Sequence, residues 1–370
     1  MKEHIIKFPE SLKDEKAFQD SMIIGFYRNG SCHEQCLSLL YEFYGLKGLS
    51  AEKIAAIGRY LDTSYKRPLD GNLEKMEVEK KLINNFKEPL NATLPVQFEI
   101  KNFADGASAA AKLKERIFND IPTLIAVNDY DLPFLGGSSP GGYFNFYHTL
   151  IVIGINETNN TFIIRDPIFC NEEYLTADIL FKAWSNNDGI YSTMNAPYTF
   201  FDFRTDENGL ASFDLQKTLY SVLYQNILIY QNEQEEVRDG YKTTYGINGL
   251  VKMVAEILNT GGLSLKKYQE LQFIFYHWIR VARYRLYKFL SGSEFSDFPN
   301  SYFYSFRIYE YFDLWSACLR KMKLYIEREN VSKLLIVIQE MGEILDLEFA
   351  EIKKLEADYD AHARDLFCGF

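Results

Sequence analysis

The chain has 370 residues, of which 47% are hydrophobic and 25% are charged, as expected of a globular protein long enough for two domains. Its 40 lysines and arginines against 51 aspartates and glutamates give a formal net charge of −11. Because nucleic acid and anionic lipid both select basic surfaces, this charge argues against general binding to either, and leaves only local basic patches open.

The first residues and the cysteines predict a cytoplasmic protein. The opening segment MKEHIIKFPESLKDEK has neither the apolar stretch nor the cleavage site of a secretory signal. No segment reaches the roughly 18 uncharged apolar residues that a membrane span needs. The five cysteines are odd in number and thinly spread, which favours reduced thiols over a disulfide framework.

Helices are predicted first along the chain. Apolar residues at 36, 37, 39, 40, 43 and 44 form a helical stripe that ends at Gly45. Ser50 is suited to cap a second helix, and residues 107–119 have a further helical pattern.

Short apolar runs rich in β-branched residues follow, and they predict buried strands at 122–129, 148–156 and 161–167. The turn NETNN joins the second and third strands as a hairpin. Between the first two strands lies YDLPFLGGSSPGGYFNFY, which is either a lid over a site or a plain surface connector.

Strand patterns stop near residue 212. Residues 231–240, QNEQEEVRDG, have the composition of a charged linker, and long helical patterns follow them to the C-terminus. We therefore predict an α+β fold, with a catalytic domain at 1–210 and an all-α helical domain at 211–370.

The segment SCHEQC at 31–36 allows several interpretations. A zinc site lacks a second cluster of ligands, so no metal is expected. A disulfide between cysteines one helical turn apart is sterically awkward and disfavoured in a reducing compartment. Cys36 lies on the apolar stripe and is expected to be a buried thiol. Cys32 begins the helix, where backbone N–H groups and the helix dipole favour a thiolate nucleophile.

A nucleophilic cysteine needs a general base nearby, and a third residue must hold that base in the right orientation. His148 opens one predicted strand and Asp166 closes its hairpin neighbour, so antiparallel pairing brings the two side chains together. Cys32, His148 and Asp166 then form a papain-like triad of nucleophile, general base and orienting carboxylate. His33 is a conceivable second base, but we expect it to be exposed at the helix start.

The segments that carry these residues resemble the butirosin-biosynthesis protein H family. They are SCHEQCLSLLYEFYGL, PTLIAVNDYDLPF and YHTLIVIGINETNNTFIIRDPIF, and YGINGLVKMVAEIL and ARYRLYKFL resemble the helical domain usually fused to that family. The family is papain-like and related to the leader-cleaving cysteine peptidases of bacteriocin exporters, and the chain also resembles an amide synthetase of closthioamide biosynthesis. The resemblance implies a papain-like cysteine-peptidase fold for the N-terminal domain, with catalytic roles for Cys32, His148 and Asp166.

The reaction implied by the resemblance is amide-forming acyl transfer in natural-product biosynthesis. An acyl or peptidyl group leaves a carrier-protein thioester for Cys32 and then passes to a small amine acceptor. The phosphopantetheine of the carrier holds the substrate, so no separate cofactor is expected. A cysteine peptidase or amidase would use the same triad, so the residues leave both reactions open. The presence of all three residue types argues against a binding module on an inactive scaffold.

The oxyanion hole departs from that of the related peptidases. They have a glutamine about six residues before the cysteine, where this chain has Phe26. The Cys32 N–H with a substitute donor, Asn29 or Tyr27, is therefore expected to hold the oxyanion.

A basic cluster, RVARYRLYK, is a candidate docking surface for the carrier protein. It contains Arg280, Arg283, Arg285 and Lys288. An acidic carrier must dock on a local patch of this acidic chain, and the arginine fork suits the phosphate of phosphopantetheine. The alternative is that these arginines pair with acidic residues on neighbouring helices.

Overall fold

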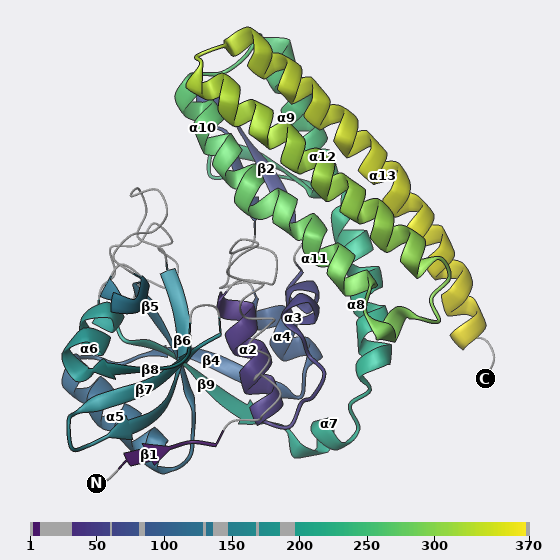
Figure 1. Cartoon of the computed structure of the whole chain (residues 1–370). Helices are drawn as coiled ribbons and strands as arrows, with labels where there is room; N and C mark the ends of the chain where they lie inside the picture. Colours follow the sequence, from purple (N-terminus) through teal and green to yellow (C-terminus); the bar gives the residue numbers. More distant parts are fainter. Residues whose placement is uncertain are drawn as a thin grey trace. The chain divides into compact units, whose positions relative to one another are not determined.

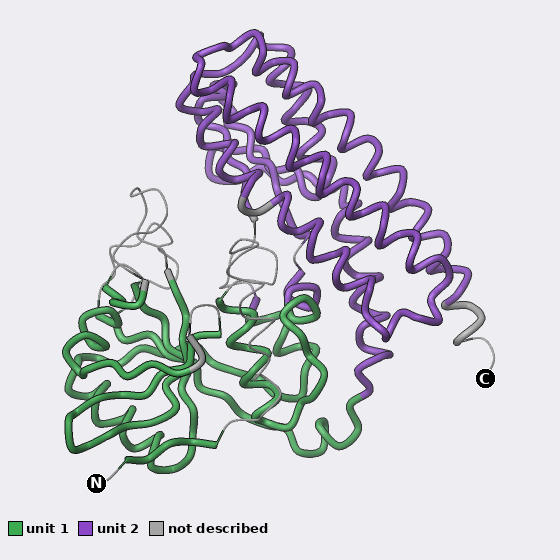
Figure 2. Tube along the Cα trace, viewed as in Figure 1, with its two compact units in different colours: residues 1–54, 87–213 green, residues 55–86, 214–370 purple. Residues whose placement is uncertain are grey.

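The structure is a computed structural model, and it describes residues 3–7, 32–59, 61–80, 86–128, 131–135, 147–167, 170–185 and 197–367. The chain forms two compact units (Figure 2). The first consists of residues 1–54 and 87–213, and the second of residues 55–86 and 214–370. A sheet with flanking helices occupies the first unit and long helices dominate the second, so the predicted α+β class is confirmed.

The first unit is built on a seven-stranded antiparallel sheet in the order β4-β9-β5-β6-β7-β8, with β1 paired to β6. Its strands are β1 (Glu3–Ile5), β4 (Val96–Asn102), β5 (Thr123–Asn128), β6 (Tyr147–Asn156), β7 (Thr161–Asp166), β8 (Cys170–Thr176) and β9 (Thr199–Thr205). The predicted strands at 122–129, 148–156 and 161–167 are confirmed as β5, β6 and β7. β6 and β7 form the predicted hairpin.

Helices cover both faces of this sheet (Figure 1). α5 (Gly106–Phe118) and α6 (Ala177–Ser185) share one apolar core with β5, β6 and β7. α2 (Cys32–Phe43) packs against the opposite face. Shorter helical elements of this unit are α4 (Lys87–Thr93), η5 (Pro133–Leu135) and α7 (Glu207–Ala211).

Alternation along β9 separates the two faces. Phe200 belongs to the core beneath α5 and α6, whereas Phe201 and Phe203 point to α2. The ring centroids lie 5.4 Å apart for Phe201 and His33, and 6.0 Å apart for Phe203 and Tyr41. The β9 aromatics therefore fix where α2 lies on the sheet.

Long helices of the second unit pack side by side, with α12 between α11 and α13, and α9 also against α13 (Figure 1). The helical elements are η2 (Leu73–Lys75), α8 (Leu215–Tyr230), α9 (Gly246–Thr260), α10 (Leu265–Ile274), the π-helix η7 (Phe275–Ile279), α11 (Arg280–Leu290), η8 (Ser293–Phe295), α12 (Ser301–Glu327) and α13 (Val331–Phe367). α3 (Ala51–Ile57) crosses the division between the units. None of the helices in the described ranges combines the length and apolar character needed to cross a membrane.

The second unit also contains a four-stranded antiparallel sheet, in the order β10-β11-β2-β3. Its strands are β2 (Thr63–Pro68), β3 (Glu77–Lys80), β10 (Glu235–Arg238) and β11 (Tyr241–Tyr245). The prediction of a linker at 231–240 and of no strands after residue 212 is therefore wrong. All four residues of β10 are exposed, so this edge strand has no apolar alternation to reveal it.

The sheet explains why residues 55–86 group with the C-terminal helices. β11 pairs with β2 along the whole length of β11, from Tyr245 opposite Ser64 to Tyr241 opposite Pro68. The helical part is accordingly not all-α. The predicted domains, 1–210 and 211–370, and the papain-like identity of the first stay predictions.

Candidate functional site

The two cysteines of α2 have different surroundings. Cys32 is the first residue of α2 and is partly exposed, whereas Cys36 is fully buried. The Cys36 thiol donates to the Thr149 carbonyl at 3.4 Å. Burial raises the pKa of Cys36 well above its usual value, and the charges of Cys32 and Asp166 raise it further. Cys36 is the buried thiol that the sequence predicted, and of the two only Cys32 is accessible.

His148 and Asp166 meet between β6 and β7. Ile151 pairs with Arg165, so Asp166 lies diagonally across the hairpin from His148. His148 Nε2 lies 2.6 Å from Asp166 Oδ2. The two side chains are 7% and 0% exposed, so the pair is shielded from solvent. The predicted proximity of these two residues is present in the structure.

The charges around His148 favour its protonated form. Burial lowers the pKa of the imidazole, but the charges of Asp166 and Cys32, and hydrogen bonds to both, outweigh it and set the pKa well above 6.5. Because Nε2 is bonded to Asp166, Nδ1 is the ring nitrogen that remains for the Cys32 thiol. The structure therefore brings together a thiol, an imidazolium and a carboxylate in that order.

His33 does not lie where we expected it. It is 1% exposed and packs on Phe201, so the prediction of an exposed histidine is wrong. His33 precedes Cys36 by three residues and therefore shares the buried face of α2. Burial lowers its pKa to about 4 against the opposing charge of Glu34, which leaves the imidazole neutral near pH 7.

The predicted oxyanion-hole donors, Asn29 and Tyr27, lie outside the described residues, as do Phe26 and most of the glycine-rich segment after β5. Their roles stay predictions. Within the described ranges, no three His, Cys, Asp or Glu side chains are grouped so that they could hold a metal ion.

The predicted docking cluster on α11 is largely buried. Arg283 is 2% exposed and Arg285 3% exposed, so the prediction that these two side chains form a surface for the carrier is wrong. Arg280 is partly buried, lies over the Tyr276 ring and donates to Ser316 Oγ at 3.3 Å. Lys288 is exposed beside two tyrosine rings.

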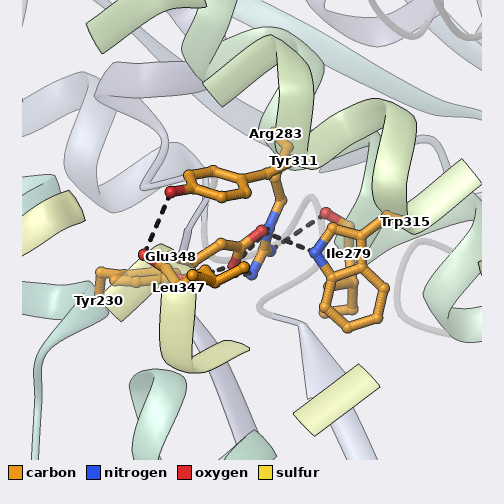
Figure 3. Close-up of polar contacts among 7 residues, drawn as sticks. All are labelled: Tyr230, Ile279, Arg283, Tyr311, Trp315, Leu347 and Glu348. Atoms are coloured by element: carbon orange, nitrogen blue, oxygen red, sulfur yellow. Dashed lines mark hydrogen bonds and ion pairs between the residues drawn. The ribbon is translucent and has the colours of Figure 1, made fainter. Parts of the chain in front are cut away.

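Arg283 instead forms an ion pair inside the helical unit, as the alternative interpretation held (Figure 3). Its Nε lies 3.0 Å from Glu348 Oε1, and its Nη2 lies 2.6 Å from Glu348 Oε2. The remaining guanidinium nitrogen, Nη1, donates to the Ile279 carbonyl at 3.1 Å. All three nitrogens of the guanidinium are therefore hydrogen-bonded within the protein, so this group is not available to bind a phosphate.

Glu348 gathers further donors from other helices (Figure 3). Trp315 Nε1 donates to Oε1 at 2.6 Å, and the Tyr230 hydroxyl donates to Oε2 at 2.5 Å. The network therefore joins α8, α11, α12 and α13. The sequence contained a signal for the burial of Glu348. This residue takes an apolar position in the helical stripe that continues at Ile352 and Leu355, which are 2% and 1% exposed.

Residues 31–167 match the family model described as butirosin biosynthesis protein H, N-terminal. The match includes Cys32, His148 and Asp166 and all of β5, β6 and β7. It supports the family resemblance of the N-terminal part. No curated protein matches the chain.

Proposed function

We propose that this protein is a biosynthetic acyltransferase with Cys32 as its nucleophile, because residues 31–167 match the family model described as butirosin biosynthesis protein H, N-terminal. The observation that carries the proposal is the environment of His148. Its buried imidazole is hydrogen-bonded to Asp166 at 2.6 Å and to Cys32, and its pKa is raised. An imidazolium stabilises a neighbouring thiolate, and the thiolate is the nucleophilic form of cysteine.

In the first step the Cys32 sulfur attacks the carbonyl carbon of a thioester. The bond to the donor sulfur breaks, the acyl group stays on Cys32, and the departing thiolate takes the proton of His148. The donor that we propose is an acyl or peptidyl group on the phosphopantetheine of a carrier protein, as the resemblance implies.

In the second step a small amine attacks the acyl carbon on Cys32. The neutral His148 now accepts a proton from the amine nitrogen, the Cys32 thiolate departs, and an amide is released. Asp166 holds the imidazole in place through both steps. A thioester carries enough free energy for this transfer, provided that water is kept from the acyl group.

The test uses a small acyl thioester of N-acetylcysteamine, with and without an added primary amine, and follows both protein and products by mass spectrometry. We expect an acyl adduct on Cys32 that the amine discharges as an amide. Cys32→Ala should give no adduct, and Cys36→Ala should behave as the wild type. An adduct that is released only as free acid would identify a cysteine hydrolase instead, and no adduct at all would refute the proposal.

A further inference from the structure

The second unit contains a cavity of about 440 Å³ that the proposed reaction does not use. Its wall is built from the turn after α3, the last turn of α8 and the strands β10 and β11. The charged residues of the wall are Arg59, Asp62, Glu235 and Glu236. A cavity of this size, with a few polar groups in its wall, is typical of a small-molecule site.

Arg59 supplies a cation to this cavity. Its φ of 59° is the left-handed conformation that ends α3 and turns the chain towards β2. The Ala56 carbonyl accepts the Arg59 N–H at 3.0 Å and the Asn226 side-chain amide of α8 at 2.8 Å, so the turn is fixed to α8. Within the described ranges the Arg59 guanidinium makes no hydrogen bond or ion pair.

The two glutamates of β10 differ in what they already bind. Glu235 is paired with Lys242 at 2.6 Å and also with Lys252, so its charge is neutralised within the sheet. Glu236 accepts the Tyr245 hydroxyl at 2.8 Å through Oε2. Among the residues that the structure describes, its Oε1 has no partner. Glu236 is therefore the glutamate with an oxygen left for a ligand.

A further carboxylate lies near Glu236. The hydrogen bond to Glu236 and the nearby charge of Asp62 both raise the pKa of Tyr245. Tyr245 pairs with Ser64 across β11 and β2, which brings the segment that contains Asp62 to the same ring. This part of the wall is therefore anionic.

We propose that this cavity binds a small zwitterion of the α-amino acid class, with the ligand carboxylate on Arg59 and its ammonium group on Glu236. Arg59 and Glu236 line one cavity and make no ion pair with each other, so a ligand can lie between them. The planar arginine fork suits a carboxylate, to which it can donate two hydrogen bonds. A ligand with a single charge would leave one of the two groups unpaired, whereas a zwitterion pairs both. The inference concerns the second unit alone and does not rest on the proposed function.

The test uses the full chain and the proteinogenic L-amino acids, each added singly at millimolar concentration and detected by saturation-transfer NMR. Titration calorimetry then gives the Kd of the best binder. Since a hydrogen bond to a charged group is worth more than a neutral one, we expect Arg59→Gln and Glu236→Gln each to weaken binding by about 10-fold or more. Arg238→Gln is the matched control, because Arg238 is an exposed residue of β10 outside the cavity wall. It should bind as the wild type does.

Two derivatives of the best binder test each contact without a change in the protein. The methyl ester lacks the carboxylate charge, so it should bind the wild type more weakly and lose nothing further in Arg59→Gln. The N-acetyl derivative lacks the ammonium charge and should show the same relation to Glu236→Gln.

Three results would overturn the inference. One is that no amino acid binds the wild type. Another is that Arg59→Gln and Glu236→Gln bind as tightly as Arg238→Gln, which would assign the ligand to a different site. The third is that the methyl ester binds the wild type as tightly as the free amino acid, which would mean that the carboxylate is not recognised.

Discussion

His148 and Asp166 belong to neighbouring antiparallel strands, and their side chains meet with Nε2 and Oδ2 2.6 Å apart in the interior of the first unit. The hairpin turn after β6 sets the register that makes this contact. A buried carboxylate needs such a partner, because unpaired charge is costly away from water. The pair therefore stabilises the fold as well as serving the proposed reaction.

Removal of either partner should affect turnover more than folding. Removing one member of a cooperating triad costs on the order of 10⁴-fold in rate, so His148→Ala should be nearly inactive. Asp166→Asn should be less severe, because the amide can still bond to the imidazole. Rates of amide formation with the thioester and amine measure both effects. Wild-type turnover in His148→Ala would refute the role of general base.

The protonation of His148 should make stability depend on pH. Its pKa in the folded chain lies well above 6.5, its value in the unfolded chain. The protonated pair then stabilises the fold fully below about pH 6.5, and this contribution is lost as the pH rises through the folded pKa. Asp166→Asn should shift that loss to lower pH.

NMR titration of the His148 ring nitrogens, together with the free energy of unfolding at each pH, checks this. A titration of wild-type His148 at or below pH 6.5 would contradict the electrostatic argument.

Cys32 and Cys36 should differ in reactivity although they are one helical turn apart. Cys36 is fully buried, and its pKa is raised well above the usual value. Iodoacetamide should therefore label Cys32 in the folded protein and leave Cys36 unmodified until the protein is denatured. Peptide mapping after brief labelling measures the ratio. Preferential labelling of Cys36 would reverse the assignment of the nucleophile.

Breaking the Arg283–Glu348 pair should destabilise the helical unit. Arg283→Ala leaves the Glu348 charge buried without its cation, which costs about 3–5 kcal/mol in the free energy of unfolding. The double variant Arg283→Met with Glu348→Leu should be more stable than Arg283→Ala, because no uncompensated charge remains.

Lys288→Ala on the same helix is the matched control, with a change within about 0.5 kcal/mol. Denaturant unfolding followed by tryptophan fluorescence measures each variant. An Arg283→Ala protein as stable as Lys288→Ala would show that the buried pair contributes little.

Features of local origin could be predicted from the sequence. β5, β6 and β7 are runs of β-branched residues, and the turn NETNN lies directly between two of them. The meeting of His148 and Asp166 needs only that hairpin. The accessibility of Cys32 and the burial of Cys36 follow from the apolar stripe of one helix.

Tertiary structure decided the features that depend on distant partners. β10, with the sequence EEVR, is mostly charged, and it becomes a strand because β11 pairs both with it and with β2, which lies far away in the chain. In the sequence Arg283 is part of a basic cluster that could have been exposed. In the structure the carboxylate of Glu348, on another helix, forms an ion pair with Arg283, and both side chains are buried in the helical unit. The sequence determines which segments tend to form strands or helices and which side chains carry charge. Which strands pair, and which charged side chains are buried, depends on which of them meet in the folded chain.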